Sequence, residues 1–333
     1  MASELRVGTR GSQLALWQAH LVKRRLEAAG APPCRIVVIA TSGDRLQEAP
    51  LSDVGGKRLF VKEIEDALLR NEVDLAVHSS KDMPAVLPPG LLIAGVLPRE
   101  DPLDAIVLPA SSRALSAVGH EPSGMTLEQV VAALGPTPSI GTGSVRRIAQ
   151  LTRLMPNARF APIRGNLDTR LRKLDEGAHD ALVLAAAGLR RLGFASRISM
   201  TLPAEACVPA PGQGIVAVEV RGDDIETRRA VARIDDREAG AALRAERALV
   251  EALGGGCQPP IGALALPAGG ELTLTAAVVA IDGSRAVRAH GRAPQADAAA
   301  LGAHVAKELL AQGAGEILAD AMRSHGAVEG LQP

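Results

Sequence analysis

Hydrophobic residues recur with two different spacings as far as Val220. An apolar run at Leu5–Thr9 predicts a short buried strand, and apolar positions three and four residues apart over Gln13–Ala29 predict an amphipathic helix. Ser12 is a suitable N-cap for this helix, and Gly30 follows its expected end. The same alternation predicts further strands and helices at Arg35–Ala40, Val61–Arg70, Val73–His78, Ala105–Leu108, Thr126–Leu134, Ser139–Gly141, Ser144–Met155, Arg159–Pro162, Leu167–Glu176, Ala181–Leu184 and Ile215–Val220.

Strands that alternate with helices are typical of βαβ units, so this part of the chain predicts an α/β fold with parallel or mixed sheets. The pattern restarts after Pro102, and Pro109–Met125, rich in Ser, Gly and Pro, predicts an exposed loop. The run Pro203–Gly214 holds three prolines and two glycines, which is the composition of a hinge. At ~150 residues per domain, the length predicts two or three domains.

The pattern changes from Glu238 onward. A helix that ends at Leu253 is followed by alternating strands and two terminal helices, which predicts a small α+β domain. Its strands are expected at Gly262–Leu266, Leu272–Ile281 and Ala286–Gly291. The expected organisation is therefore residues 1–102 plus 213–235 as domain 1, 103–212 as domain 2 and 236–333 as domain 3.

The composition excludes several classes of protein. Lysine plus arginine and aspartate plus glutamate both count 37, so the net charge is zero, which argues against a nucleic-acid-binding protein. Aromatic residues are 1% of the chain, too few for a site built on base stacking. The three cysteines, Cys34, Cys207 and Cys257, are typical of a reduced compartment. With no expected signal peptide and no apolar run of ~18 residues, we expect a cytoplasmic protein without a membrane partner.

The zero net charge conceals a strongly basic segment. Between Ile140 and Arg191 there are nine arginines and one lysine against four acids, a net charge of +6. Within it, Gly141–Arg147 reads as a strand end, a glycine turn and a helix start, where free backbone N–H groups attract anions. The paired arginines there suit carboxylates, which a guanidinium binds bidentately, and the phosphate-binding pattern GxxxxGK[ST] is absent. The alternative is that these arginines form an ordinary solvated surface.

Two further segments carry candidate chemistry. Lys81 and Asp82 follow the strand that ends at His78, and ligands of α/β sheets bind beyond the carboxyl ends of strands. A surface turn is the alternative. Cys257 lies between three glycines and Gln258-Pro259-Pro260, which predicts a presented thiol rather than a packed one, with a structural cysteine as the alternative. The chain contains no CxxC, HExxH or GxSxG pattern, so neither a metal site nor a standard hydrolase site is predicted.

Several motifs together resemble the porphobilinogen deaminase (hydroxymethylbilane synthase) family over nearly the whole chain. Each is weak alone, but their order and spacing are specific. They are Arg10–Gln18, Gly55–Lys62, His78–Pro84, Gly141–Arg147, Arg164–Asn166, Pro211–Gly214 and Gly255–Gln258.

The resemblance implies a transferase of tetrapyrrole and haem biosynthesis. In this family a dipyrromethane cofactor is attached through a cysteine thioether, which here falls on Cys257. Porphobilinogen loses ammonia to give an azafulvene-type electrophile, and the free α-carbon of the growing chain attacks it. Four additions and a hydrolysis release the linear tetrapyrrole hydroxymethylbilane. The resemblance also suggests a monomer.

The family's functional residues carry over onto this chain. The resemblance implies that Asp82 is the catalytic carboxylate, in contact with the pyrrole N–H groups. The carboxylates of cofactor and substrate would be bound by Arg10, Ser12, Lys81, Thr142, Ser144, Arg146, Arg147, Arg164, Arg170 and Arg191. Gln18, Lys57 and Phe60 would belong to the lid and pocket, and the segment from Gly43 to Gly56 is expected to be a mobile lid. Gly143, where the family commonly has serine, and Asp168 depart from the pattern.

Two other classes share part of this pattern. Two α/β domains with a hinge also describe periplasmic-binding-protein-like proteins that close on small anions, although that class does not explain Cys257. A nucleotide-dependent oxidoreductase would need a third glycine where the turn has Arg146. The expected fold class is therefore two periplasmic-binding-protein-like α/β domains with mixed sheets plus a smaller C-terminal α+β domain.

Overall fold

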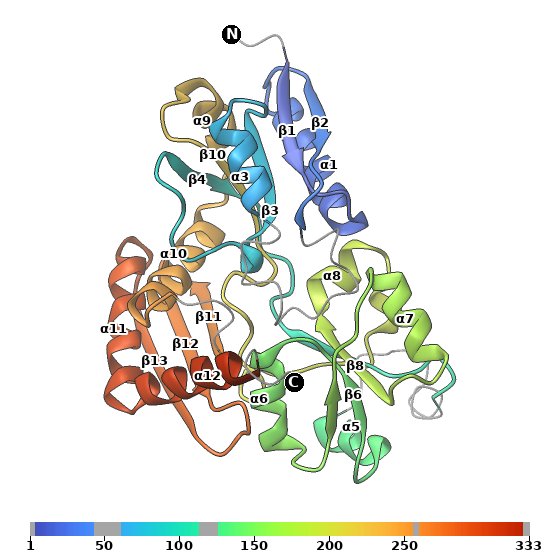
Figure 1. Ribbon diagram of the computed structural model, residues 1–333. Helices are drawn as coiled ribbons and strands as arrows, with labels where there is room; N and C mark the ends of the chain where they lie inside the picture. The colour runs from blue at the N-terminus through green and yellow to red at the C-terminus, as the bar shows by residue number, and fades with distance from the viewer. Residues whose placement is uncertain (1–3, 43–60, 113–125, 256–259, 329–333) are drawn as a thin grey trace.

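The computed structural model describes residues 4–42, 61–112, 126–255 and 260–328. Three units are visible in Figure 1, and each is built around its own sheet. Two of the sheets have five strands of mixed direction, and the third has three antiparallel strands. This confirms the predicted class, and we refer to the units in chain order as domains 1, 2 and 3. The domain boundaries expected from the sequence stay a prediction.

The sheet of domain 1 has the order β2-β1-β3-β10-β4. Its strands are β1 (Leu5–Thr9), β2 (Cys34–Val38), β3 (Leu75–Ser79), β4 (Leu91–Val96) and β10 (Val216–Arg221). β1 runs parallel to β2 and β3, whereas β10 runs antiparallel to β3 and β4. Helix α1 (Gln13–Ala28) and helix α9 (Ile225–Ala232) pack on one face, and α3 (Lys62–Leu69) packs on the other. As predicted, Ser12 is the N-cap of α1, and its Oγ accepts a hydrogen bond from the backbone N–H of Ala15.

Domain 2 repeats this arrangement with the order β7-β6-β8-β5-β9. Its strands are β5 (Asp104–Val107), β6 (Ser139–Gly141), β7 (Arg159–Ala161), β8 (Ala181–Ala185) and β9 (Met200–Thr201). β6 is parallel to β7 and β8, and β5 is antiparallel to β8 and β9. Helices α5 (Leu127–Leu134) and α6 (Val145–Leu154) contribute to the core on one face, and α7 (Leu167–Asp175) and α8 (Ala186–Arg191) to that on the other.

The chain crosses twice between these domains. The first crossover, residues 97–103, leads from β4 into β5, and the second, residues 202–215, leads from β9 back into β10. A backbone hydrogen bond of 3.0 Å joins the two crossovers from Glu100 N to Gly214 O, and another of 3.0 Å runs from Leu97 N to the O of Val216, the first residue of β10. The Pro/Gly run that predicted a hinge is the second crossover. Domain 2 is therefore connected to domain 1 by two neighbouring segments that hold each other.

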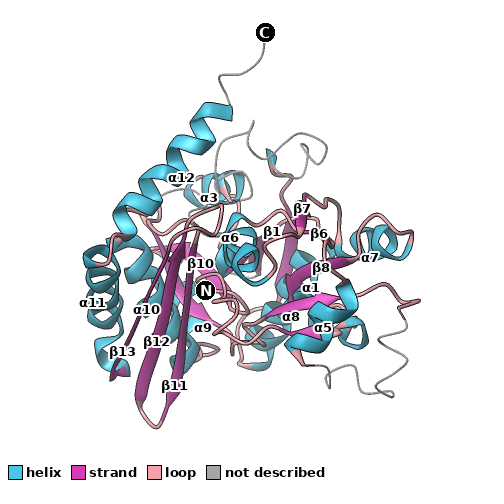
Figure 2. Cartoon of the chain, turned by 90° about the horizontal axis from the view of Figure 1, so that it is seen from below, coloured by secondary structure: helices cyan, strands magenta, loops and turns pink. Residues whose placement is uncertain are grey.

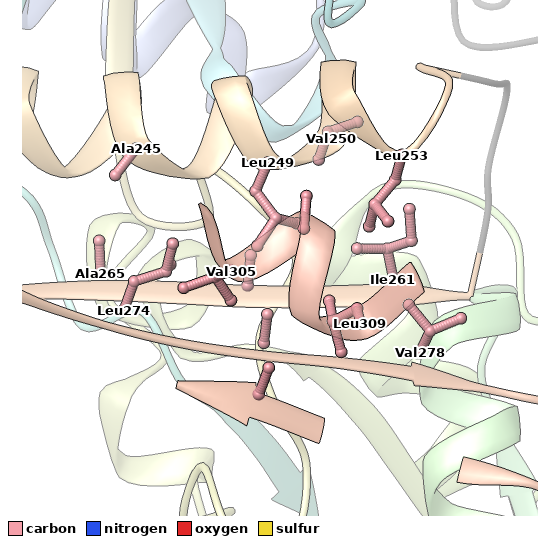
Figure 3. Close-up of a cluster of buried hydrophobic side chains, with 14 of the residues drawn as sticks. Ala245, Leu249, Val250, Leu253, Ile261, Ala265, Leu274, Val278, Val305 and Leu309 are labelled. Atoms are coloured by element: carbon pink, nitrogen blue, oxygen red, sulfur yellow. The ribbon is translucent and has the colours of Figure 1, made fainter. Parts of the chain in front are cut away.

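Domain 3 packs three helices with its antiparallel sheet. The elements are α10 (Arg237–Ala252), β11 (Ile261–Ala268), β12 (Glu271–Val279), β13 (Ala286–Pro294), α11 (Ala298–Ala311) and α12 (Ala314–Val328). Figure 2 shows the three strands side by side, and Figure 3 shows side chains of α10, α11 and the sheet meeting in the core, among them Leu249, Ile261 and Leu309. No helix in the described part of the chain is long and apolar enough to cross a membrane.

Hydrophobic spacing predicts most of these elements to within a few residues, but it does not predict β4, β9, α8 or α9. β9 has two residues, too few to show any period. Helix α8 has six residues, and it follows β8 without an intervening loop. Most of the predicted loop Pro109–Met125 and the segment from Gly43 to Gly56 lie outside the described residues.

The contact between α10 and α11 depends on a glycine. A Cβ atom added to Gly302 would overlap the carbonyl oxygen of Ala245 and lie 2.9 Å from the Cβ of Ala248. We therefore expect Gly302→Ala to lower the free energy of unfolding by about 1–3 kcal/mol, because the helices must separate. Chemical denaturation of the full chain measures this change.

The matched control for that substitution is Gly315→Ala in α12. A Cβ there would lie 3.7 Å from the side chain of Leu310, an ordinary contact distance. Alanine also has the higher helix propensity, so we expect unchanged or slightly increased stability. Equal destabilisation by both substitutions would contradict the role of Gly302.

Candidate active site

A buried carboxylate lies where the first crossover enters domain 2. Asp104, the first residue of β5, is fully buried and binds two adjacent arginines of α6. Its Oδ2 accepts from Arg146 Nη1 at 2.7 Å, and its Oδ1 accepts from Arg147 Nε at 2.9 Å. The Arg146 Nη2 and Arg147 Nη2 groups approach the same carboxylate at 3.1 and 2.8 Å. Burial alone would raise the pKa of Asp104, but the charges of Arg146 and Arg147 outweigh it and hold that pKa well below its usual range.

Both arginines are also bound to the backbone of their surroundings. Arg146 Nη1 donates to Val208 O at 2.8 Å, and Arg147 Nη1 donates to Val183 O at 3.0 Å. Their side chains are at most 10% exposed. The sequence predicted that Arg146 and Arg147 bind substrate carboxylates. In the structure both bind a carboxylate of the protein itself, Asp104, which hydrophobic spacing and local charge did not identify as their partner.

Lys81 and Asp82 face these groups from domain 1. Both lie in the 3₁₀ turn Ser80–Asp82 that directly follows β3, and both are half-buried. Burial lowers the pKa of the Lys81 ammonium to about 8, assisted by Arg147 and Arg146 and opposed by Asp82 and Asp104. Lys81 therefore lies within electrostatic reach of the arginine pair across the domain boundary.

Arg170 brings a further positive charge to the same place. It lies in α7 and is half-buried, and its Nε donates to Gly165 O at 2.8 Å. Burial and repulsion by Arg147 and Arg164 lower its pKa, while the charge of Asp82 raises it. Lys81, Asp82, Arg147, Arg164 and Arg170 are thus neighbours, and the described groups leave an excess of positive charge among them.

Arg191 connects domain 2 with domain 1 and the second crossover. It ends α8; its Nη2 donates to Gly214 O at 2.7 Å, and its guanidinium lies over the ring of Trp17 at 5.7 Å from the centroid. Burial lowers the pKa of Arg191, and Glu100 opposes that shift. Trp17 belongs to α1, so this contact spans the two α/β domains.

The predicted hydroxyl groups lie at helix starts. Ser12 and Ser144 are the N-caps of α1 and α6, and their Oγ atoms accept from the backbone N–H of Ala15 and Arg147 at 3.3 and 3.5 Å. The Thr142 hydroxyl oxygen accepts from Ser144 N at 3.4 Å. These groups form the helix N-termini expected to attract anions.

Gln18 and Arg10 belong to the segment that follows β1. Gln18 is buried, and its Nε2 donates to Ser79 Oγ at 2.9 Å, which fastens α1 to the end of β3. Arg10 is half-buried at the end of β1, the strand next to β3 in the sheet. Gln18 therefore supports the turn that carries Lys81 and Asp82.

The remaining predicted site residues, Lys57, Phe60 and Cys257, lie outside the described residues. The last described residue before Cys257 is Gly255, and a Cβ on Gly255 would lie 3.9 Å from the Cβ of Ala85. Ala85 follows Asp82 by three residues, and its carbonyl accepts from Arg247 Nη2 of α10 at 2.7 Å. Among the residues that can be described, no group of three His, Cys, Asp or Glu side chains could hold a metal ion.

Two α/β domains that direct lysine and arginine side chains at one place, with a third domain beside them, define a multidomain α/β protein with a cationic site between its domains. Comparison with known proteins identifies the group. Residues 5–229 match the family model described as porphobilinogen deaminase, dipyromethane cofactor binding domain, and residues 241–311 match the model of the porphobilinogen deaminase C-terminal domain. The chain belongs to the porphobilinogen deaminase family.

Curated relatives support this assignment along the whole chain. A porphobilinogen deaminase of Syntrophobacter fumaroxidans is 45% identical over 322 residues, which cover 96% of this chain and 98% of the relative. One of Geobacter metallireducens is 44% identical over 318 residues, covering 95% and 94%. The sequence-based prediction of the family is confirmed, and with it a transferase of tetrapyrrole biosynthesis that holds a dipyrromethane cofactor.

Similar solved structures include the periplasmic VFT2 domain of Bordetella pertussis BvgS, with a TM-score of 0.37 and 15% identity over 70% of this chain and 86% of that one. A putative methionine-binding lipoprotein of Bacillus subtilis has a TM-score of 0.39 and 13% identity over 70% and 90%. At these scores the likeness says nothing about function.

The buried Asp104 generates a stability prediction. Asp104→Ala leaves Arg146 and Arg147 without their counter-charge, and removing one partner of a buried ion pair costs about 3–5 kcal/mol of unfolding free energy. We expect a loss of this size in chemical denaturation.

The control for Asp104→Ala is Glu226→Ala, which removes a carboxylate from an exposed pair. The side chains of Glu226 and Arg229 are 70% and 72% exposed, so solvent screens their attraction and little change is expected. A loss no larger for Asp104→Ala than for Glu226→Ala would show that the buried cluster contributes nothing to stability.

Proposed function

We propose that this protein deaminates porphobilinogen and joins four molecules head to tail on a dipyrromethane primer attached to Cys257, then releases hydroxymethylbilane by hydrolysis. The observation that carries this proposal is the half-buried Asp82 carboxylate set among an excess of cations from both α/β domains. We also propose that the enzyme acts as a cytoplasmic monomer.

The described cations fit the cofactor that the family holds. Each pyrrole ring of the cofactor carries two carboxylates. Burying a neutral polar group without a hydrogen-bond partner costs about 2–7 kcal/mol, and burying an unpaired carboxylate costs more. Burial and the neighbouring arginines lower the pKa values of Lys81 and Arg170 by more than the nearby aspartates raise them, so a ligand carboxylate would stabilise both cations. When bound, the dipyrromethane supplies the nucleophilic pyrrole carbon to which the first substrate is joined.

Attachment to Cys257 is supported by the state of the other two thiols. Burial raises the pKa of Cys34 to about 11 and that of Cys207 to about 12, so both remain protonated near neutral pH. Cys257 follows Gly255 by two residues, and Gly255 lies beside the segment that carries Asp82. The chain therefore passes the segment that carries Asp82 two residues before the proposed attachment site.

Asp82 is proposed as the catalytic residue. Its carboxylate can accept hydrogen bonds from pyrrole N–H groups and oppose the positive charge that develops as ammonia leaves. The same oxygens can hold a proton removed from the ring once the new bond has formed. Lys81 and Arg170 are the cations whose charges interact with Asp82.

The substrate carboxylates are proposed to bind the cations and hydroxyls predicted from the sequence. Among the described residues, the side chains of Lys81, Arg164, Arg170 and Arg191 form no ion pair with a carboxylate, so their charges are the ones most directly offered to a ligand. Arg146 and Arg147 would act from within their complex with Asp104, adding positive potential while remaining fixed.

Intact-protein mass spectrometry tests the attachment. The purified protein should exceed its sequence mass by one dipyrromethane, and the Cys257→Ser variant should lack that increment because serine cannot form the thioether. Cys34→Ser is the matched control and should keep the increment, since Cys34 is a buried thiol of domain 1. An unmodified protein that is nevertheless active would contradict the mechanism.

Asp82→Asn tests the catalytic role. The variant should fold and keep its cofactor but lose about 10²–10⁴-fold in turnover, the usual contribution of a general acid–base group. Ammonia release from porphobilinogen is the measurement, and Asp223→Asn, an exposed aspartate of the same domain, should leave it unchanged. A turnover of Asp82→Asn close to that of the wild-type protein would refute the role of Asp82.

A further inference from the structure

The motif Pro211–Gly214 has no role in the function proposed above, although it lies in the second crossover between the domains. Its Gln213 side chain is completely buried. The flanking Gly212 and Gly214 have φ values of +73° and +86°, a backbone conformation that favours glycine. A Cβ on Gly212 would lie 2.6 Å from Ser80 Oγ, and one on Gly214 would overlap the carbonyl oxygen of Glu100. The turn is therefore held tightly between the Ser80–Asp82 turn and the first crossover.

The orientation of the Gln213 amide follows from its partners. Its Nε2 donates to Pro102 O at 2.7 Å and to Asp104 Oδ1 at 3.0 Å, and both of these atoms can only accept. The Oε1 must therefore point the other way, where it accepts from Lys81 Nζ at 3.4 Å. The backbone carbonyl of Gln213 accepts from Arg99 Nε at 2.9 Å, which prevents the turn from rotating.

Gln213 thus joins the two halves of the site through one side chain. On one side is the Lys81 ammonium of domain 1, and on the other is the Asp104 carboxylate that binds Arg146 and Arg147 of domain 2. We propose that Gln213 is a positioning residue that holds Lys81 in place for a substrate carboxylate without neutralising its charge.

A neutral amide suits this task for a physical reason. A lysine ammonium is a flexible point charge, and both Asp82 and Asp104 attract it. A carboxylate in place of the Gln213 amide would hold Lys81 but cancel its charge and repel Asp104. An apolar side chain would leave the ammonium free to move toward either aspartate. Glutamine accepts from Lys81 and donates to Asp104, so it fixes the distance between them and leaves the positive charge available.

The inference rests on the proposed function only for the statement that Lys81 binds a substrate carboxylate. The positioning of Lys81 can be measured on the cofactor-loaded enzyme without substrate. An amine-selective reagent acylates Lys81 at a series of pH values, and peptide mass spectrometry measures the extent of labelling at each pH. The groups that face Lys81 and set this titration are Asp82, Asp104, Arg146 and Arg147. The pKa of Lys81 is about 8 in the protein without a ligand, and a cofactor carboxylate beside the ammonium would raise the wild-type midpoint above that value.

Two substitutions change the Lys81 contact in opposite ways. Gln213→Glu places a negative charge beside the ammonium and should raise the labelling midpoint by about one pH unit or more, because an opposite charge favours the charged form. We expect kcat/KM to fall at alkaline pH as Lys81 loses its proton, and in Gln213→Glu this fall should occur at higher pH. Gln213→Met removes the acceptor and should lower the midpoint. It should also raise KM for porphobilinogen about tenfold with kcat changed much less, the pattern for lost uniform binding.

Gln150→Met is the matched control. Gln150 is a buried amide of α6 that also binds the second crossover, through Val208 N at 2.8 Å and Val208 O at 3.0 Å, but it forms no hydrogen bond with a charged side chain in the described structure. It should reduce stability without moving the Lys81 midpoint or KM. This separates positioning from a general loss of packing.

The outcomes are distinct. An unchanged Lys81 midpoint in Gln213→Met, or a shift equal to that of Gln150→Met, would overturn the proposal, and Gln213→Met remains informative if Gln213→Glu fails to fold. A shifted midpoint with an unchanged KM would support the positioning by Gln213 and contradict the binding of substrate by Lys81, so the two claims fail separately.

Discussion

The ion cluster around Asp104 is the interaction on which the site between the α/β domains depends. Removing a carboxylate from water is costly unless paired charges and hydrogen bonds replace the solvent, and Asp104 receives both from Arg146, Arg147 and Gln213. These partners come from α6 and the second crossover, so one carboxylate fixes the start of β5, the first turn of α6 and the path back to domain 1. The rest of the cationic site is built around this fixed point.

The crossovers carry a second buried carboxylate that connects them with domain 3. Glu246 of α10 accepts from Arg99 Nη1 of the first crossover and Gly212 N of the second, each at 2.6 Å. It also accepts from Ala265 N of β11 at 2.7 Å. Glu246 therefore connects α10 and β11 of domain 3 with both crossovers. Two buried acids, Asp104 and Glu246, thus connect the crossovers with domains 2 and 3.

Hydrophobic period and helix caps are local properties, so they predicted the three sheets and the main helices, and the order of the sequence motifs predicted the family. They also located Lys81 and Arg170 at strand and helix ends, where ligands of α/β sheets bind. They could not identify Asp104 as the partner of the arginine pair, because it precedes Arg146 by 42 residues and looks like an isolated acid before a predicted strand. The net charge of +6 counted between Ile140 and Arg191 overstates the free charge for the same reason.

The Asp104 carboxylate and the Gln213 amide therefore have different effects on the cations of one site. Asp104 neutralises part of the arginine charge permanently, which allows two guanidinium groups to be buried and rigid before any ligand arrives. Gln213 contacts the same carboxylate but meets Lys81 with a neutral oxygen, so that cation stays charged and loses only its freedom to move. The proposed elongation would bring a growing number of carboxylates into the site. Such a site needs enough internal compensation for the empty protein to fold and enough uncompensated charge for the ligand to bind. The balance between these demands explains why a protein of zero net charge concentrates its cations where its own acids only partly reach them.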